Sequence, residues 1–125
     1  MDQMTNKFDF IEFLNHKISW SAKNFGPGRR TKGIVAHIRK ELQEVEANPT
    51  DLEEWADIIL LAIDGAWRSG ATSEQIAGML MGKMRKNELR NWPDWRKMKE
   101  GDPIEHVREG DVSRSDLFDG GHQEK

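Results

Sequence analysis

The stretch KELQEVEANPTDLEEWADIILLAIDGAW, from Lys40 to Trp67, combines apolar residues at helical spacing with many carboxylates. The pair Asn48-Pro49 interrupts it, because the residue before a proline avoids helical geometry. The interruption is short, so the two helical segments are expected to pack as antiparallel neighbours. The stretch therefore predicts a helical hairpin that carries acidic side chains, and this hairpin decides the fold.

The remaining sequence predicts an all-α protein. Apolar residues three and four positions apart predict helices over about 6–25, 31–47, 50–69 and 72–91. Thr50 and Glu53 match a capping box at the start of the third helix. We expect residues 1–108 to form one all-α domain and the polar, glycine-containing residues 109–125 to form a flexible tail.

Composition excludes several classes of function. The net charge of −3 argues against a protein that coats nucleic-acid polymers, which usually carries a basic excess. The absence of cysteine excludes thiol chemistry and cysteine-ligated zinc, and it fits a reducing compartment. No apolar run approaches the ~18 residues of a membrane span. We therefore expect a cytoplasmic protein with no membrane partner.

Two acidic pairs are expected to face each other across the hairpin. Glu41 and Glu44 are three residues apart on one helix, and Glu54 and Asp57 have the same spacing on the next. Two carboxylates ~5 Å apart repel by about 3 kcal/mol at an effective dielectric near 20. Mg²⁺ or Mn²⁺ relieves such repulsion, since both prefer oxygen ligands. The alternative is an ordinary solvated acidic surface, helped by the helix dipole near Glu53.

A basic face on the fourth predicted helix completes a candidate polyphosphate site. Lys83, Lys86, Asn87 and Arg90 continue the direction of that helix's apolar stripe. Bound cations bridge phosphate oxygens while lysine and arginine bind the others. The alternative is that acidic and basic helices neutralise each other in ion pairs.

Three further residues are candidates for substrate binding. Arg30 lies in the glycine-rich segment NFGPGRRTKG, where arginine suits phosphate. His37 lies on the flank of the acidic pair, and Trp20 could form a wall for a nucleobase. The alternatives are a solvated arginine, a hydrogen-bonded structural histidine and an aromatic residue used for packing.

The order of these motifs resembles a known family. ExxE (Glu41, Glu44), ExxD (Glu54, Asp57) and KxxKN (Lys83, Lys86, Asn87) resemble the MazG-like all-α nucleoside triphosphate pyrophosphohydrolases. The stretches FGPGRRTKG, HIRKELQEVEANPTDLEEWADIILLAIDGAWR, KNELRNWPDW and IEHVR resemble the dATP/dGTP diphosphohydrolase branch found in phages and prophages.

The resemblance implies a four-helix core assembled as a homo-dimer or a dimer of dimers. It also implies cleavage of dATP or dGTP to monophosphate and pyrophosphate with Mg²⁺ or Mn²⁺ as cofactor. Selection of dGTP would suit a phage pathway that makes 2-aminoadenine nucleotides. The alternatives from other classes are a non-catalytic helical interaction module and a sensor that binds nucleotide without cleaving it.

Residue roles follow from the same resemblance. It implies metal binding and catalysis by Glu41, Glu44, Glu54 and Asp57, and phosphate or sugar contacts by Lys83, Lys86 and Asn87. The family's broader motif is EExxE, but Lys40 occupies its first position here. This departure leaves open the number of metal ions and the identity of the carboxylate that accepts a proton from water, for which Glu41 is the candidate.

Overall fold

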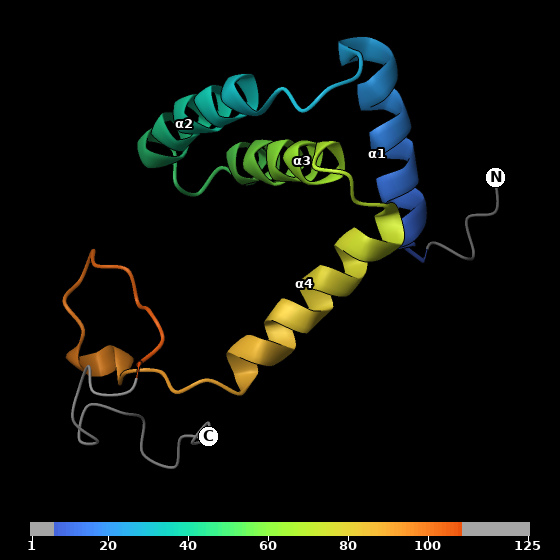
Figure 1. Ribbon diagram of the computed structural model, residues 1–125. Coiled ribbons are helices and arrows are strands. Elements are labelled where there is room, and N and C mark those ends of the chain that lie inside the picture. Colours follow the sequence, from blue (N-terminus) through green and yellow to red (C-terminus); the bar gives the residue numbers. More distant parts are fainter. Residues whose placement is uncertain (1–6, 109–125) are drawn as a thin grey trace. The chain divides into compact units, whose positions relative to one another are not determined.

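The computed structural model describes residues 7–108, and its regular secondary structure is helical (Figure 1). Its elements are α1 (Phe10–Phe25), α2 (Thr31–Ala47), α3 (Leu52–Arg68), α4 (Ser73–Glu88) and a 3₁₀ turn, η1 (Trp95–Lys97). Residues 7–108 contain no β-strand, which confirms the all-α prediction. None of the helices in this range has both the length and the apolar character needed to cross a bilayer. The predicted tail, 109–125, lies outside the described residues.

The chain divides between Met79 and Leu80 into two compact units. The core of the first unit joins α1, α3 and the start of α4. Leu14, Ile63 and Ile76 are buried together, and they are surrounded by partly buried residues from the same elements, among them Phe10, Phe13, Ile18, Ala66, Trp67 and Ala77. Met79 and Leu80 lie three and four residues after Ile76, at the spacing that predicts a shared inward face, but both are exposed. The buried part of α4 is thus its first turn and a half.

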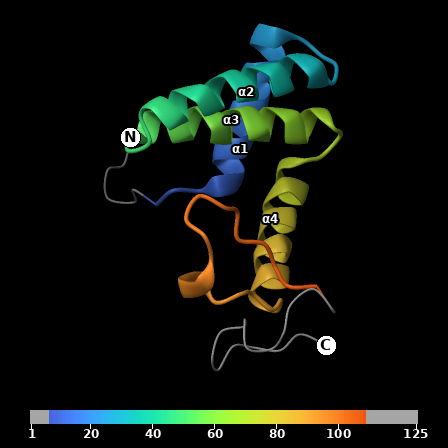
Figure 2. The ribbon, with the colours of Figure 1, turned by 90° about the vertical axis from the view of Figure 1, so that its left-hand side faces the viewer.

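Helices α2 and α3 form the predicted hairpin and lie side by side in both views (Figures 1 and 2). Ile34 and Val45 are the buried residues of α2. The bounds of α2 agree with the prediction from apolar spacing. Because α3 contacts both α1 and α2, it is the central element of this unit. The side chains of α3 therefore pack against two different helices, α1 and α2.

The cap of α3 differs from the predicted capping box. Asp51, not Thr50, is the N-cap, and its side chain accepts a hydrogen bond from the backbone N–H of Glu53 at 3.0 Å. The helix therefore begins at Leu52. Thr-x-x-Glu matches the capping-box motif, but Asp51 also caps well and is one residue closer to the first helical turn.

We expect Asp51→Ala to lower the free energy of unfolding by about 1 kcal/mol, the usual effect of losing a cap. Asn caps as well as Asp, so Asp51→Asn should retain the stability of the wild-type protein. Denaturant unfolding followed by circular dichroism measures both variants. Thr50→Ala is the matched control, and a larger loss for Thr50→Ala than for Asp51→Ala would contradict the assignment.

The second unit contains the end of α4 and the segment around η1. The Trp92 indole N–H donates to the Asn87 carbonyl at 2.7 Å, and the Val107 N–H donates to the Asn91 carbonyl at 2.7 Å. The segment from 91 to 107 is thereby tied to itself and to the end of α4.

Candidate metal centre

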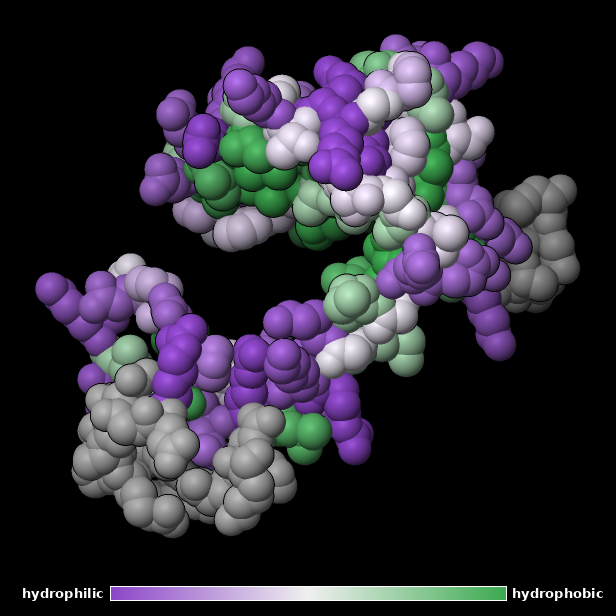
Figure 3. All heavy atoms as spheres, viewed as in Figure 1, coloured by the Kyte–Doolittle hydropathy of each residue, from purple (hydrophilic) through white to green (hydrophobic). Residues whose placement is uncertain are grey.

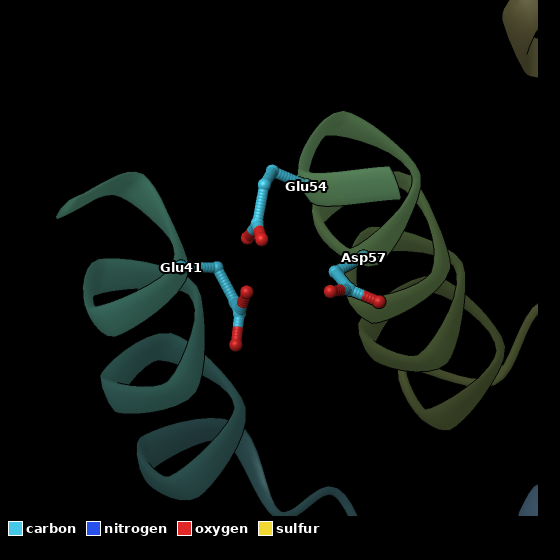
Figure 4. A group of neighbouring side chains, drawn as sticks. All are labelled: Glu41, Glu54 and Asp57. Atoms are coloured by element: carbon cyan, nitrogen blue, oxygen red, sulfur yellow. The ribbon is translucent and has the colours of Figure 1, made fainter. Parts of the chain in front are cut away.

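Three carboxylates converge between α2 and α3. Glu41 extends from α2, and Glu54 and Asp57 extend from α3 toward it (Figure 4). One ligand oxygen from each residue lies within 4.8 Å of the other two. All three side chains are partly exposed, so an ion in solution can reach them. The structure thus brings together three of the four residues predicted to bind metal.

Glu44, the fourth, is exposed on α2 and lies outside this convergent group. Its charge nevertheless acts on the site. Partial desolvation raises the pKa of Glu54 above its ordinary value of 4.5, and the negative charges of Glu44, Asp51, Glu41 and Asp57 raise it further. The fold of the hairpin therefore keeps these acidic side chains close together although their negative charges repel one another.

The residues present suit a hard divalent cation. Carboxylate oxygens are the protein ligands that Mg²⁺ and Mn²⁺ prefer, and three of them at this separation provide a ligand set that leaves room for water or phosphate. A basic group, His37, adjoins the site, and its Nε2 lies 3.5 Å from a carboxylate oxygen of Glu41. A cation between the two helices would relieve the repulsion that raises the pKa of Glu54.

We expect Glu54→Gln to change thermal stability in opposite directions with and without metal. A raised carboxyl pKa means that the folded state binds the proton more tightly than the unfolded chain does. Ionised Glu54 therefore destabilises the metal-free fold, and this effect grows as pH rises from 4.5 through the folded pKa. At neutral pH in EDTA, Glu54→Gln should melt above the wild-type protein. In Mn²⁺, it should lack most of the stabilisation that ligand binding gives the wild type.

Glu46→Gln is the matched control, because Glu46 is an exposed glutamate on α2 outside the acidic group. Its melting temperature should follow that of the wild type in both conditions. A Glu54→Gln variant that retained the full Mn²⁺ shift would show that the acidic group is not a metal site.

A buried ion pair two turns further along α3 from Asp57 was missed by the sequence analysis. Helical spacing places Asp64 and Arg68 on the polar arc of α3, yet their side chains are only 6% and 0% exposed. Arg68 Nε donates to Asp64 Oδ2 at 3.2 Å. The Ser21 hydroxyl and the Trp67 indole N–H both donate to Asp64 Oδ1. The signal available in the sequence was an Asp–Arg pair four residues apart on the most apolar helix.

Arg68 also holds the loop that joins α1 to α2. Its Nη1 donates to the carbonyl oxygens of Gly26 and Gly28, both at 2.9 Å. Both glycines have positive φ, 77° and 99°, which a residue with a Cβ adopts rarely. The buried guanidinium therefore fixes the course of the glycine-rich segment in which Arg30 lies.

The pKa of Asp64 reflects this environment. Burial alone would raise it, but the hydrogen bonds from Ser21 and Trp67, together with the positive charges of Arg68 and Lys17, lower it below the ordinary 3.8. Asp64 is consequently ionised at neutral pH and forms a true ion pair with Arg68.

A pocket of about 150 Å³ lies beside the acidic group, within the first unit. It is lined by Lys17, Phe25, Arg30, Gly33, Ile34, His37, Leu61 and Asp64. Two of the predicted substrate-binding residues, Arg30 and His37, thus share one cavity. Lys17 was not identified from the sequence, because a lone lysine on α1 carries no motif.

Trp20 stands next to this pocket and does not line it. Trp20 is 49% exposed, and its ring meets Phe25 edge-on, with centroids 5.4 Å apart. The Lys17 ammonium lies 5.5 Å from the Trp20 ring centroid, and the Arg30 guanidinium lies 5.7 Å from that of Phe25. Trp20 therefore contacts two residues that line the pocket, Phe25 and Lys17, and supports their positions.

The predicted phosphate contacts Lys83, Lys86, Asn87 and Arg90 belong to the second unit, and the acidic group belongs to the first. Within the second unit, Arg90 Nη1 donates to Asn87 Oδ1 at 3.2 Å. Their contact with substrate remains a prediction.

Two comparisons with known proteins found a match. The model of the family described as dATP/dGTP pyrophosphohydrolase matches residues 13–112. The Eaa protein of Salmonella phage P22 is 37% identical over 63 residues, which cover 50% of this chain and 19% of that protein. The chain thus matches about a fifth of the length of this curated relative. No solved structure matches the chain.

Proposed function

The chain belongs to the dATP/dGTP pyrophosphohydrolase family and is an enzyme that acts on nucleoside triphosphates; we propose that it hydrolyses dATP or dGTP at a divalent metal site formed by Glu41, Glu54 and Asp57. Water would form a bond to the α-phosphorus, the bond from that phosphorus to the α–β bridging oxygen would break, and pyrophosphate would leave. The observation that carries this proposal is the convergence of three carboxylates within 4.8 Å on two adjoining helices.

The residues around this site have distinct proposed roles. When bound, Mg²⁺ or Mn²⁺ would supply phosphate binding and an activated water. Glu41 is the proposed proton acceptor, and His37 at 3.5 Å is placed to orient it. Glu44 is the proposed additional ligand, because it lies near enough to Glu54 to raise its pKa.

The pyrophosphate portion needs positive charge as it leaves. Lys83, Lys86, Asn87 and Arg90 are the proposed contacts for it, since lysine and arginine bind phosphate oxygens. We also propose that the enzyme prefers dGTP to dATP and works in the cytoplasm, where such nucleotides are consumed.

We propose a homo-dimer or a dimer of dimers as the working assembly. Leu52, Trp55 and Ile59 form an apolar stripe on α3 with 78%, 46% and 59% of their surface exposed. Figure 3 shows hydrophobic residues gathered on the surface of the α2–α3 pair. An uncovered stripe of large apolar residues on the central helix favours contact with a second copy.

The test of the proposed function is product analysis. Each dNTP and NTP is incubated with the protein and Mg²⁺ or Mn²⁺, and products are separated by chromatography. We expect dGMP or dAMP together with pyrophosphate, and no reaction in EDTA. Nucleotide-dependent thermal stabilisation without product would indicate a sensor. Neither stabilisation nor product would indicate a helical interaction module.

A further inference from the structure

The pocket lined by Lys17, Arg30 and His37 lies along the same two helices as the acidic group. His37 is four residues before Glu41 on α2, and Leu61 is four residues after Asp57 on α3. Four residues of α-helix span about 6 Å. When the phosphates of a ligand bind at the carboxylates, the part of the ligand that is attached to those phosphates therefore lies at this pocket.

The lining of the pocket suits a planar, uncharged group better than a phosphate. Phe25, Ile34 and Leu61 supply apolar walls. Asp64 also lines the pocket, but its carboxylate is paired with Arg68 and hydrogen-bonded to Ser21 and Trp67. Small-molecule sites that bind rings typically combine apolar walls with a few placed polar groups, as this pocket does.

The polar groups of the pocket are mostly hydrogen-bond donors. Lys17 and Arg30 only donate, and most of the accepting capacity of Asp64 is taken by Ser21, Trp67 and Arg68. Guanine presents two adjacent acceptors, O6 and N7, and arginine or lysine is the usual partner of that edge. Adenine replaces O6 with an amino group that donates.

We propose that this pocket receives the purine base of the substrate and that Lys17 and Arg30 favour guanine over adenine. The inference rests on the proposed function, whose acidic group holds the phosphate end. It assigns the pocket a ligand, the guanine base, and it assigns Lys17 a role in specificity.

The rim of the pocket is held in place before any ligand binds. Lys17 contacts the ring of Trp20, which packs edge-on against Phe25, and Arg30 contacts the other ring of that pair, Phe25. Arg68 fixes the loop between Phe25 and Arg30 through the carbonyls of Gly26 and Gly28. Donors restrained in this way lose little freedom on binding, so they discriminate well between bases.

The test compares kcat/KM for dGTP and dATP in the wild type, Lys17→Met and Arg30→Gly. Arg30 has a φ of 50°, which glycine adopts without strain, so Arg30→Gly should fold. We expect the wild type to prefer dGTP and each variant to lose about 10-fold of that preference. Lys23→Met is the matched control, because Lys23 is an exposed lysine on α1 outside the pocket.

A modified substrate sharpens the test. In 7-deaza-dGTP a carbon replaces N7, so one acceptor of the guanine edge is lost. The wild type should hydrolyse it with a kcat/KM about 10-fold lower than that for dGTP. Whichever of Lys17→Met and Arg30→Gly has lost the residue that binds N7 should hydrolyse the two substrates with equal kcat/KM. If Lys17→Met and Arg30→Gly slow dGTP and dATP by the same factor, the pocket holds phosphate and the proposal is overturned. A wild-type preference for dATP overturns it as well.

Binding without metal separates this inference from the proposed function. Calorimetric titration of dGMP and dAMP into the protein in EDTA requires no catalysis. Tighter binding of dGMP that Lys17→Met abolishes supports the pocket even if no dNTP is hydrolysed. Equal binding of dGMP and dAMP refutes the pocket even if pyrophosphate is released.

Discussion

Asp57→Asn should release pyrophosphate from dGTP about 1,000-fold more slowly than the wild type at saturating Mg²⁺. Asp57 contributes one of the three convergent carboxylates, and it lies past the first turn of α3. Metal ions stabilise transition-state charge on phosphates by several kcal/mol, and each 1.36 kcal/mol changes a rate tenfold. Removing one of the three ligand charges should therefore remove most of this stabilisation of the transition state.

Glu53→Gln is the control for Asp57→Asn. Glu53 is an exposed carboxylate in the first turn of α3 and lies outside the convergent group. Its loss should leave the rate of pyrophosphate release near that of the wild type. Circular dichroism should show the same helical content in both variants. An Asp57→Asn enzyme within a few-fold of wild-type activity would mean that the reaction takes place elsewhere on the protein.

Arg68→Met should be the most destabilising of these substitutions. It leaves the Asp64 carboxylate buried without its counter-charge, and breaking a buried pair on one side costs about 3–5 kcal/mol. For a domain of this size such a loss lowers Tm by on the order of 20 °C. The carbonyls of Gly26 and Gly28 lose their partner as well. Differential scanning calorimetry measures the effect directly.

The double variant Asp64→Asn/Arg68→Met separates charge from packing. The side-chain amide that replaces the Asp64 carboxylate retains an oxygen that can accept from Ser21 and Trp67, and neither buried charge remains. The double variant should therefore be more stable than Arg68→Met alone. If the two substitutions simply add, the ion pair is not coupled as the geometry indicates.

Acid unfolding gives an independent measure of the same pair. The pKa of Asp64 is lowered by folding, so its contribution to stability is present above the unfolded value of 3.8 and is lost as pH falls through the folded pKa. The Asp64→Asn variant should lack this part of the acid transition.

Most of the fold and part of the site could be predicted from patterns among residues that are close together in the sequence. Apolar spacing gave α2 with its observed bounds, and the short break at Asn48-Pro49 gave the hairpin that brings Glu41 to Glu54 and Asp57. These features depend on residues near one another in sequence, so periodicity and spacing are enough to predict them.

Features that depend on distant contacts were not predictable in the same way. Asp64 is buried because α1 supplies Ser21, which is 43 residues away in the sequence. Lys17 lines a pocket because the α1–α2 loop and α3 close around it. The cap of α3 was misassigned between two adjacent residues that are both good caps, and only backbone geometry distinguishes them.

The left-handed backbone of Arg30 places two demands on one position. Glycine or asparagine would adopt that conformation with less strain. A screen for variants with higher thermal stability should therefore select one of these two residues at position 30. Either replacement would remove the guanidinium from the pocket. If the pocket recognises guanine as proposed, such a substitution at position 30 would raise thermal stability and lower the discrimination between nucleotides.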